Sequence, residues 1–415
     1  MAAGALASAA LAGSAGSAVS ASGSADGSAG GSASRTGALV LDHDAISSTG
    51  ESGTEVSGRN DVVLGLGGSG TSARTSRLSR VRPGVTYTKL VSSSSRGTTR
   101  ATLLTVDLRN KHIGLDVVDG SSLTGLSSVR SLMGSTKRYV AAVNGDFFDI
   151  EGTNAPLGTA YSPTTGLLNA RSQDWNQTLM VNRRGRVVFD KVQLYGRVVG
   201  IRHGQLTNVN SATVIAGGIG LYTRHWGSGS PGYAVVEGHR KHVRMVVIQN
   251  GRVTANRPRI VSGRTIKGSI LIGRGSGATA LRALEVGQRV TVRRGLVGHP
   301  RLALTGGRIF INDGVGLSTL DDTETAPRTV VGIDRDTGQL LMLAIDGRST
   351  RSRGFTLDEL VSIMEQLGAD EALNLDGGGS TTMVVRRQGR LRTINTPSDG
   401  RERAVANALV VTWTK

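Results

Sequence analysis

The sequence of 415 residues contains no cysteine, which excludes disulfide bonds and thiolate metal sites. Its seven histidines are scattered. The nearest pair with helical spacing, His239 and His242, has no third ligand close by, whereas a zinc site needs three or four. There is also no run of eighteen apolar residues, so we expect no membrane-spanning helix.

Aromatic residues are scarce as well, at 3% of the chain. The formal net charge of +18 would suit a nucleic-acid partner. The basic residues, however, are spread along the chain, and so few aromatic rings cannot supply the stacking platforms of single-strand binders. We therefore predict a solvated basic surface and no nucleic-acid partner, a surface that is compatible with anionic polymers of a cell wall.

The composition changes once, near residue 78. Residues 1–78 are dominated by alanine, glycine, serine and threonine, and such a segment cannot bury enough apolar surface to order itself. We therefore predict a disordered segment and linker over 1–78. Its first residues resemble the small-residue part of a signal peptide, although they lack a basic leader. We expect a secreted or cell-wall-associated protein, with a plain low-complexity tail as the alternative.

The rest of the chain, residues 79–415, has the patterns of a folded domain. Apolar runs and alternating stretches of strand length dominate, with an especially β-rich middle section at about 190–300. The clearest helix is "TLDELVSIMEQLG", in which Thr356 and Glu359 form a capping box and Gly368 marks the end. Strands outnumber helices without regular alternation. The sequence therefore predicts an α+β fold with mixed sheets and a few flanking helices.

Three apolar strands each end in a carboxylate with a glycine beside it: "YVAAVNGDFF", "LLMLAIDGRS" and "EALNLDGGGS". One such aspartate could simply begin a turn. Three of them favour a shared site, because a strand end fixes a side chain while a small-residue turn leaves room for a ligand. We expect the segments Asn144–Asp146, Asp346–Arg348 and Asp376–Ser380 to converge on one cleft.

The glycine triplet at 377–379 suggests what the site holds. Without side chains, successive N–H groups can face a ligand oxygen and form an anion-binding concavity, to which Ser380 and Thr381 add hydroxyl donors. Two nearby arginines, Arg328 and Arg403, are suited to grip a phosphate or carboxylate. The pattern is not the dinucleotide-binding glycine motif, because a strand-like run follows instead of a helix.

These motifs, in this order, resemble the phosphodiester glycosidase family over roughly residues 80–413. The resemblance is strongest in the C-terminal third, from "APRTVVGIDRDTG" through "LNLDGGGSTTMVV" to "NTPSDGRERAVANALVV". It extends to "AAVNGDFF", to "APLGTAYSPTTGLL", and to the double glycine of "ALTGGRIFINDG". The chain departs from the family pattern after Asn-Gly, where it has Asp146, so the sequence favours Asp346 and Asp376 over Asp146 as catalytic groups.

The resemblance implies a hydrolase that cleaves a sugar-1-phosphodiester at its anomeric C–O bond. The transition state of that reaction resembles an oxocarbenium ion, which carboxylates stabilise, while arginines and N–H groups neutralise the departing phosphate. The expected catalytic residues are Asp376, Asp346, Asp146 and Arg328. The expected substrate-binding residues are Asn144, Gly145, Gly306, Gly307, Arg348, Asn374, Gly377, Gly378, Gly379, Ser380, Thr381, Arg403 and Asn407.

No cofactor or metal is required by this chemistry, although clustered Asp and Asn oxygens could accept Ca²⁺ or Mg²⁺. Two alternatives stay open. One is a glycosidase that acts on a non-phosphorylated exopolysaccharide or wall polymer, distinguished by its neutral product. The other is a non-catalytic wall-glycan-binding protein, which would need aromatic platforms that this composition hardly supplies.

Overall fold

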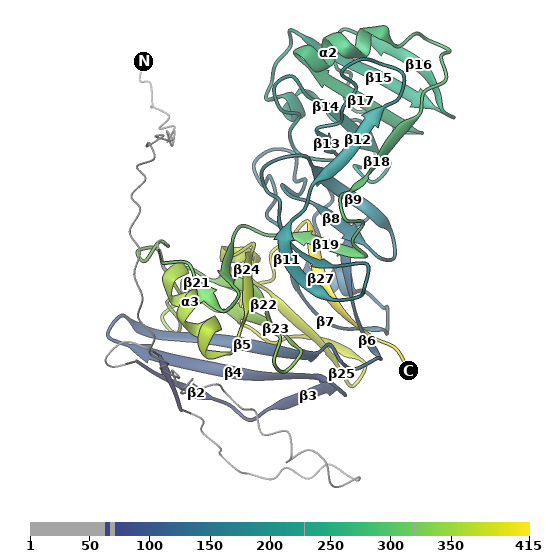
Figure 1. Cartoon of the computed structure of the whole chain (residues 1–415). Helices are drawn as coiled ribbons and strands as arrows, with labels where there is room; N and C mark the ends of the chain where they lie inside the picture. The colour runs from purple at the N-terminus through teal and green to yellow at the C-terminus, as the bar shows by residue number, and fades with distance from the viewer. Residues whose placement is uncertain (1–62, 67–70, 228, 319) are drawn as a thin grey trace, which may run out of the picture. The chain divides into compact units, whose positions relative to one another are not determined.

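The computed structural model describes residues 63–66, 71–227, 229–318 and 320–415 (Figure 1). The predictions for residues 1–62, including the signal-peptide resemblance, lie outside these residues. Strand pairing begins on the N-terminal side of the predicted boundary at 78, because strand β2 (Thr71–Thr75) pairs antiparallel with β4 (Val85–Ser94). Two hydrogen bonds continue this contact, from Ser76 N to Lys89 O and from Thr88 Oγ1 to Ser76 O.

The strands form two large sheets, one smaller sheet and a ribbon. The first ten-stranded sheet has the order β1-β2-β4-β5-β23-β22-β24-β20-β21, with β3 paired to β4. Its further strands are β1 (Val63–Leu66), β3 (Ser79–Arg82), β5 (Gly97–Asp107), β20 (Ile309–Asn312), β21 (Val315–Gly316), β22 (Arg328–Asp334), β23 (Gln339–Ile345) and β24 (Glu371–Leu375).

The second ten-stranded sheet has the order β11-β10-β19-β8-β9-β13-β14-β17-β15-β16. Its strands are β8 (Ala160–Ser162), β9 (Gly166–Arg171), β10 (Gln177–Val181), β11 (Val187–Lys191), β13 (Asn208–Val209), β14 (Ile219–Thr223), β15 (Val243–Gln249), β16 (Arg252–Arg257), β17 (Ser269–Arg274) and β19 (Leu302–Thr305). A separate two-stranded ribbon consists of β12 (Leu194–Val198) and β18 (Val292–Leu296).

The five-stranded sheet has the order β26-β25-β7-β27-β6. Its strands are β6 (Ile113–Asp119), β7 (Tyr139–Asn144), β25 (Met383–Arg387), β26 (Arg390–Thr393) and β27 (Asn407–Trp413). The helices are short: α1 (Val129–Met133), α2 (Ser276–Ala280) and α3 (Leu357–Gln366), with 3₁₀ turns η2 (Tyr233–Val236), η3 (Leu281–Ala283) and η4 (Gly378–Ser380). None of the helices in the described part of the chain is both long and apolar enough to cross a membrane.

The strand-rich α+β class predicted from the sequence is confirmed. The second sheet is mixed, because β13 pairs in parallel with β14, while the other pairings among the described strands are antiparallel. The helix predicted over "TLDELVSIMEQLG" is α3, and its capping box is present as expected: Thr356 accepts from the N–H of Glu359, whose side chain accepts from the N–H of Thr356. Gly368 follows with φ +80°, a left-handed conformation that suits glycine.

Strand β23 shows why the first sheet is covered on both faces. Every residue of β23 is buried, and its alternate side chains enter two different hydrophobic clusters. Leu340 and Met342 join the cluster shared with the second ten-stranded sheet and the five-stranded sheet, whereas Leu341 and Leu343 join the cluster under α3. In Figure 1, helix α3 lies against one face of this sheet. The shared cluster, which contains residues of β7, β24 and β27, holds the strand ends of the next section in place.

A truncation pair tests where the folded part begins. Deleting residues 1–62 should leave the melting temperature of the remainder essentially unchanged, because that composition offers little apolar surface to bury. Deleting residues 1–78 should lower it by several degrees, because it removes β1, β2 and the Ser76 hydrogen bonds. Calorimetry of the two truncated proteins checks this, and equal melting temperatures would argue against a stabilising role for β2.

Candidate active site

The predicted strand ends meet where the first sheet and the five-stranded sheet come together. In the first sheet, β22 begins at Arg328, beside the last residues of β23 and β24, Ile345 and Leu375. In the five-stranded sheet, β7 ends at Asn144 where β27 begins at Asn407. Antiparallel pairing therefore brings starts and ends of strands to the same edge of each sheet.

Asn144 ties the two edges together. It is fully buried, and its Nδ2 donates a hydrogen bond to the carbonyl oxygen of Asp376 at 2.6 Å. Its Oδ1 accepts from Thr329 Oγ1 at 2.8 Å and from Thr382 N at 3.1 Å. The sequence suggested that Asn144 binds substrate. In the structure, most of its hydrogen-bonding capacity is used within the protein, and one of its three bonds positions Asp376.

Gly145 and Asn407 add further hydrogen bonds between these strand ends. The N–H of Gly145 donates to the Asn407 carbonyl, and the Gly145 carbonyl accepts from the N–H of Asp376, both at 3.0 Å. A Cβ on Gly145 would lie 2.2 Å from Asn407 Oδ1, so the close approach requires glycine. The same Oδ1 accepts from the N–H of Asp146 at 2.8 Å.

Asp146 is the most deeply buried carboxylate of the site, at 1% exposure. Its Oδ2 accepts from the N–H of Gly158 at 2.8 Å, whereas its Oδ1 is buried without a partner. Burial raises its pKa well above the ordinary value, although the Gly158 hydrogen bond opposes this shift. The charge of Asp376 raises the pKa further and that of Arg171 lowers it.

Asp376 is the partner of Asp146. Burial raises its pKa to about 6, against hydrogen bonds from Ser380 and Gly377 and the positive charge of Arg403. Two carboxyls that repel each other in a dry environment favour a state with one shared negative charge. Both carboxyls therefore keep their protons to a higher pH than a free aspartic acid does, a property that suits acid–base groups.

Asp346 has a different set of neighbours from Asp146 and Asp376. Its Oδ1 accepts from Thr396 N at 2.8 Å, and burial raises its pKa. Asn395, next to Thr396, donates from Nδ2 to the Thr381 carbonyl at 3.0 Å. Asp346 thus supports the segment that anchors the glycine loop.

The sequence favoured Asp346 over Asp146 as a catalytic group, and the two carboxyls have different surroundings in the structure. Asp146 interacts electrostatically with Asp376, whereas the groups acting on Asp346 are Thr396, Asn395 and Lys89. Asp146 comes close to Asp376 because the N–H of Asp376 donates to the Gly145 carbonyl and Asn144 Nδ2 donates to the Asp376 carbonyl.

The glycine triplet forms a tight turn rather than an open row of N–H groups. The N–H of Gly378 donates to the Pro327 carbonyl at 2.8 Å, and those of Ser380 and Thr381 donate back to Gly377 and Gly378. Gly378 has φ +57°, which a residue with a side chain rarely adopts. These three N–H groups are therefore already bonded within the protein. Fewer N–H groups are free to bind an anion than the sequence suggested.

Two arginines lie against this turn. A Cβ on Gly379 would be 2.1 Å from Arg403 Nη2, and a Cβ on Gly378 would be 3.2 Å from Arg348 Nη1. The triplet thus makes room for guanidinium groups. Arg403 is held by Asp399 at 2.8 Å. Positive charge at the loop therefore comes mainly from side chains, and two guanidinium groups can receive a phosphate there.

The side chain of Arg328, which the sequence predicted to be catalytic, donates hydrogen bonds to two backbone carbonyls. Its Nε donates to the Phe355 carbonyl at 3.2 Å and its Nη2 to the Glu324 carbonyl at 3.1 Å. Burial lowers its pKa. These contacts hold the segments on either side of β22, close to Gly377.

Gly306, Gly307 and Asn374 form the wall next to Asp376. The N–H of Gly307 donates to the Asn374 carbonyl at 2.8 Å, and the N–H of Arg308 donates to Asn374 Oδ1 at 2.7 Å. A Cβ on Gly306 would lie 2.3 Å from the Asn374 carbonyl oxygen, so this segment needs glycine to run against β24. Asn374 thus positions this glycine segment, and its predicted role in binding substrate stays a prediction.

Buried polar atoms without partners gather at this site. Among the described residues they include Asp146 Oδ1, Thr381 Oγ1, Thr382 Oγ1 and Asn407 Nδ2. Such groups are rare in folded proteins and call for an explanation, which a polar ligand would supply. In the same described residues, no group of three or more His, Asp or Glu side chains is placed to hold a metal ion.

Sequence reasoning missed Gly158 and Arg171. Gly158 donates to Asp146, and a Cβ there would lie 2.4 Å from Thr305. The segment "APLGTA" carried the signal for Gly158, since glycine next to a strand often marks a close approach. Arg171 gave no such signal, because it is one of many arginines scattered along the chain.

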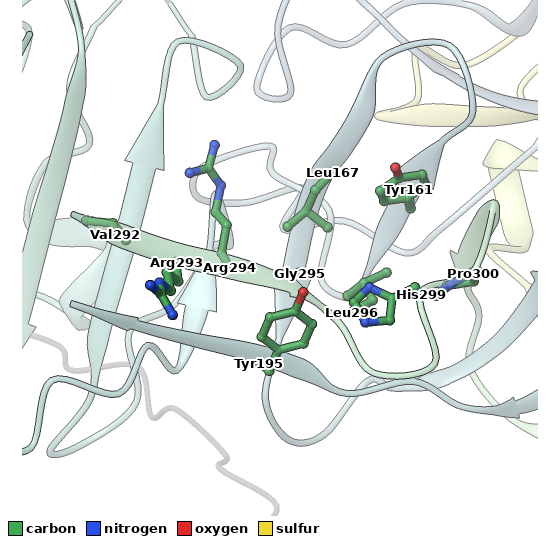
Figure 2. A pocket seen from close by; sticks show the side chains of 10 residues that line it. All are labelled: Tyr161, Leu167, Tyr195, Val292, Arg293, Arg294, Gly295, Leu296, His299 and Pro300. Carbon is green, nitrogen blue, oxygen red and sulfur yellow. The ribbon is translucent and has the colours of Figure 1, made fainter. Parts of the chain in front are cut away.

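A cavity of about 780 Å³ lies elsewhere, between the β12–β18 ribbon and the β8–β9 hairpin (Figure 2). It is lined by Tyr161, Leu167, Tyr195, Val292, Arg293, Arg294, Gly295, Leu296, His299 and Pro300. None of these is a predicted site residue. The candidate active site is therefore identified by its chemistry, not by cavity size.

Comparison with known proteins agrees with the sequence resemblance. Residues 232–412 match a family model described as phosphodiester glycosidase. This segment contains Asp346, Asp376 and Arg403, whereas Asn144 and Asp146 precede it. A stretch of 89 residues is 37% identical to the mouse N-acetylglucosamine-1-phosphodiester alpha-N-acetylglucosaminidase, covering 19% of this chain and 17% of that enzyme.

Two further proteins are similar. An uncharacterised prophage-derived protein of Bacillus subtilis is 40% identical over 87 residues, 21% of this chain and 13% of that protein. The shared stretch is thus a small part of either curated relative. The crystal structure of a hypothetical protein from Synechocystis superposes with a TM-score of 0.66 at 23% identity, over 81% of this chain and 64% of that one. This likeness supports the fold.

The raised pKa of Asp376 predicts a pH-dependent stability difference. The folded protein binds the Asp376 proton more tightly than the unfolded chain, whose pKa is near 3.8. The free energy of unfolding therefore falls as pH rises from about 4 to about 6, and this contribution is constant above that. Asp376→Asn stays neutral throughout. Relative to wild type it should gain roughly 3 kcal/mol between pH 4 and pH 7, measured by urea denaturation. An equal difference at both pH values would show that the carboxyl is not destabilised by burial.

Proposed function

We propose that this chain, whose residues 232–412 match the phosphodiester glycosidase family model, cleaves a sugar-1-phosphodiester at the anomeric C–O bond. The products are a free sugar and a phosphomonoester. The family match agrees with the resemblance drawn from the sequence and supports the expectation of a glycosidase enzyme. The observation that carries the proposal is the Asp146–Asp376 pair next to a glycine turn covered by Arg348 and Arg403. The name of the mouse relative suggests an N-acetylglucosamine-1-phosphate linkage.

The first step is loss of the phosphate from the anomeric carbon, which acquires positive charge. A carboxylate beside that carbon stabilises the charge. With a pKa of about 6, Asp376 is largely ionised at neutral pH and suits this role. It also suits the second task, which is to accept the proton of the attacking water.

The departing phosphate needs charge neutralisation more than a strong acid, because a phosphomonoester is already a good leaving group. Arg403 and Arg348 supply this charge at the glycine turn. Their carboxylate neighbours, Asp399 at 2.8 Å and Glu324 at 3.6 Å, orient them. Both pairs are partly exposed, so substrate can reach the guanidinium groups from solvent.

Asp146 supplies the remaining proton. Its Oδ2 is fixed by Gly158, whereas its buried Oδ1 has no partner within the protein, and we assign the proton transfer to this atom. Burial favours its protonated form, so it can donate a proton to the departing oxygen. The balance closes when water adds its hydroxyl to the anomeric carbon and its proton to Asp376, and a proton then passes from Asp376 to Asp146 to restore the starting state.

The proposed setting is extracellular or at the cell wall. It is supported by the small-residue composition of the N-terminal segment, by the absence of cysteine, and by a net charge of +18 that suits anionic glycan partners. A glycosidase acting on a non-phosphorylated polymer is the alternative. The arginines at the glycine turn favour the phosphodiester, since a neutral leaving group gives them no charge to neutralise.

Asp376→Asn tests the catalytic assignment. With a sugar-1-phosphodiester as substrate, wild type should release free sugar and phosphomonoester. The variant should lose about a hundredfold or more in kcat with little change in KM, because the charge is removed but the shape is kept. Asp190→Asn, at an exposed carboxylate of β11, is the matched control and should keep its activity. Near wild-type kcat in a folded Asp376→Asn protein would contradict the role assigned here.

Arg403→Gln separates phosphate recognition from general stability. Its positive charge lowers the pKa of Asp376, so its loss should move the acid limb of the kcat/KM profile to higher pH. Inhibition by inorganic phosphate should weaken at the same time. Arg401→Gln, two residues away and exposed, should change neither property. An acid limb at the same pH in Arg403→Gln and wild type would argue against contact between this arginine and Asp376.

A further inference from the structure

Two aromatic rings stand beside the candidate catalytic pair. Phe147 directly follows Asp146 in sequence, and its ring centroid lies 5.4 Å from that of Trp175, with the planes tilted by 47°. Trp175 is 36% exposed, whereas Trp226 is 5% exposed. A tryptophan kept partly in water in a chain so poor in aromatics needs a reason.

The backbone holds Trp175 in this place at a cost. Asp174 and Trp175 have φ values of +56° and +40°, the left-handed region that residues with side chains seldom adopt. Strain of this kind persists where surrounding structure imposes it, and it gathers at functional sites. Arg171 interacts electrostatically with both Asp174 and Asp146, so the strained turn belongs to the surroundings of the candidate pair.

Phe147 is fixed in a comparable way. A Cβ on Gly307 would lie 3.2 Å from the Phe147 ring, so this glycine lets the ring rest against the wall formed by Asn374. The Phe147 carbonyl accepts from the N–H of Leu157 at 2.9 Å, next to the glycine that binds Asp146. The surrounding residues therefore fix the positions of both rings.

We propose that Phe147 and Trp175 form a stacking platform for the apolar face of a pyranose ring. C–H groups of a sugar pack on aromatic rings, while its hydroxyls need polar partners nearby. The unpartnered atoms Asp146 Oδ1 and Asn407 Nδ2 are the nearest candidates for those hydroxyls. The identity of the ring as the glycosyl unit of the substrate rests on the proposed function.

The platform and the arginines together determine how the substrate would be oriented in the site. Phe147 is adjacent to Asp146, whereas Arg403 and Arg348 lie on the glycine turn that follows Asp376. The glycosyl ring therefore binds on the Asp146 side and the phosphate on the arginine side, with the anomeric carbon between the two carboxyls. Loss of the platform should weaken sugar binding and leave phosphate binding intact.

The experiment measures binding of N-acetylglucosamine and of inorganic phosphate to the full chain by saturation-transfer NMR titration. Trp175→Ala should weaken sugar binding about tenfold, the loss expected for roughly 1.4 kcal/mol of stacking, and Trp175→Phe should keep most of it. Trp175→Gly should behave like Trp175→Ala with no loss of melting temperature, because glycine adopts φ +40° without strain. Phosphate binding should stay the same in all three.

Tyr195→Ala is the matched control. Tyr195 is 42% exposed and contacts the His299 ring at 5.6 Å, but it lines the separate cavity of Figure 2. Sugar binding that is lost in Tyr195→Ala and kept in Trp175→Ala would overturn the platform, as would wild type without detectable sugar binding. If sugar binding depends on Trp175 but no sugar-1-phosphodiester is hydrolysed, the platform stands and the proposed function fails.

Discussion

The buried side chain of Asn144 is the constraint on which the site depends. Its three hydrogen bonds reach Thr329 in the first sheet, Thr382 before β25, and the carbonyl of Asp376. Each such bond stabilises folding by only about 1 kcal/mol, but leaving a buried partner unpaired costs more. Because the amide joins chain segments separated by more than 180 positions, it fixes how Asp376 stands relative to Asp146.

The charges of the site are divided by exposure. Asp146 is buried and Asp376 is mostly buried, whereas the side chains of Arg403 and Arg348 are partly exposed to water. A dry environment raises the pKa values of the carboxyls and strengthens each interaction with developing charge. The exposed arginines attract an anion without a large desolvation penalty. Under the proposed function, one side of the site would attract the substrate while the other would transfer protons.

The sequence predicted the elements well and the pairings of side chains poorly. Helix α3 and the carboxylate-bearing strand ends follow from local periodicity and turn chemistry, which are written in neighbouring residues. The sequence could not show that Asp146 lies near Asp376, because the backbone hydrogen bond from Asp376 N to the Gly145 carbonyl joins distant strands. The contacts of Asn144 and Arg328 were hidden for the same reason, since buried hydrogen bonds to distant segments decide them. Trp175 was invisible to motif analysis, because a left-handed turn has to bring it to Phe147.

Several local inconsistencies of this fold lie where chemistry is proposed. Most of the chain satisfies its polar groups and conformational preferences, as α3 does with its capping box. Around Asp146, by contrast, a carboxylate oxygen and an amide nitrogen are buried without partners, and an exposed tryptophan has a left-handed backbone. Each feature costs stability and none is needed to close the core, which Leu340, Met342 and their neighbours fill from other strands. Features that weaken the fold but converge on one carboxylate pair are best explained by a ligand that contacts them all.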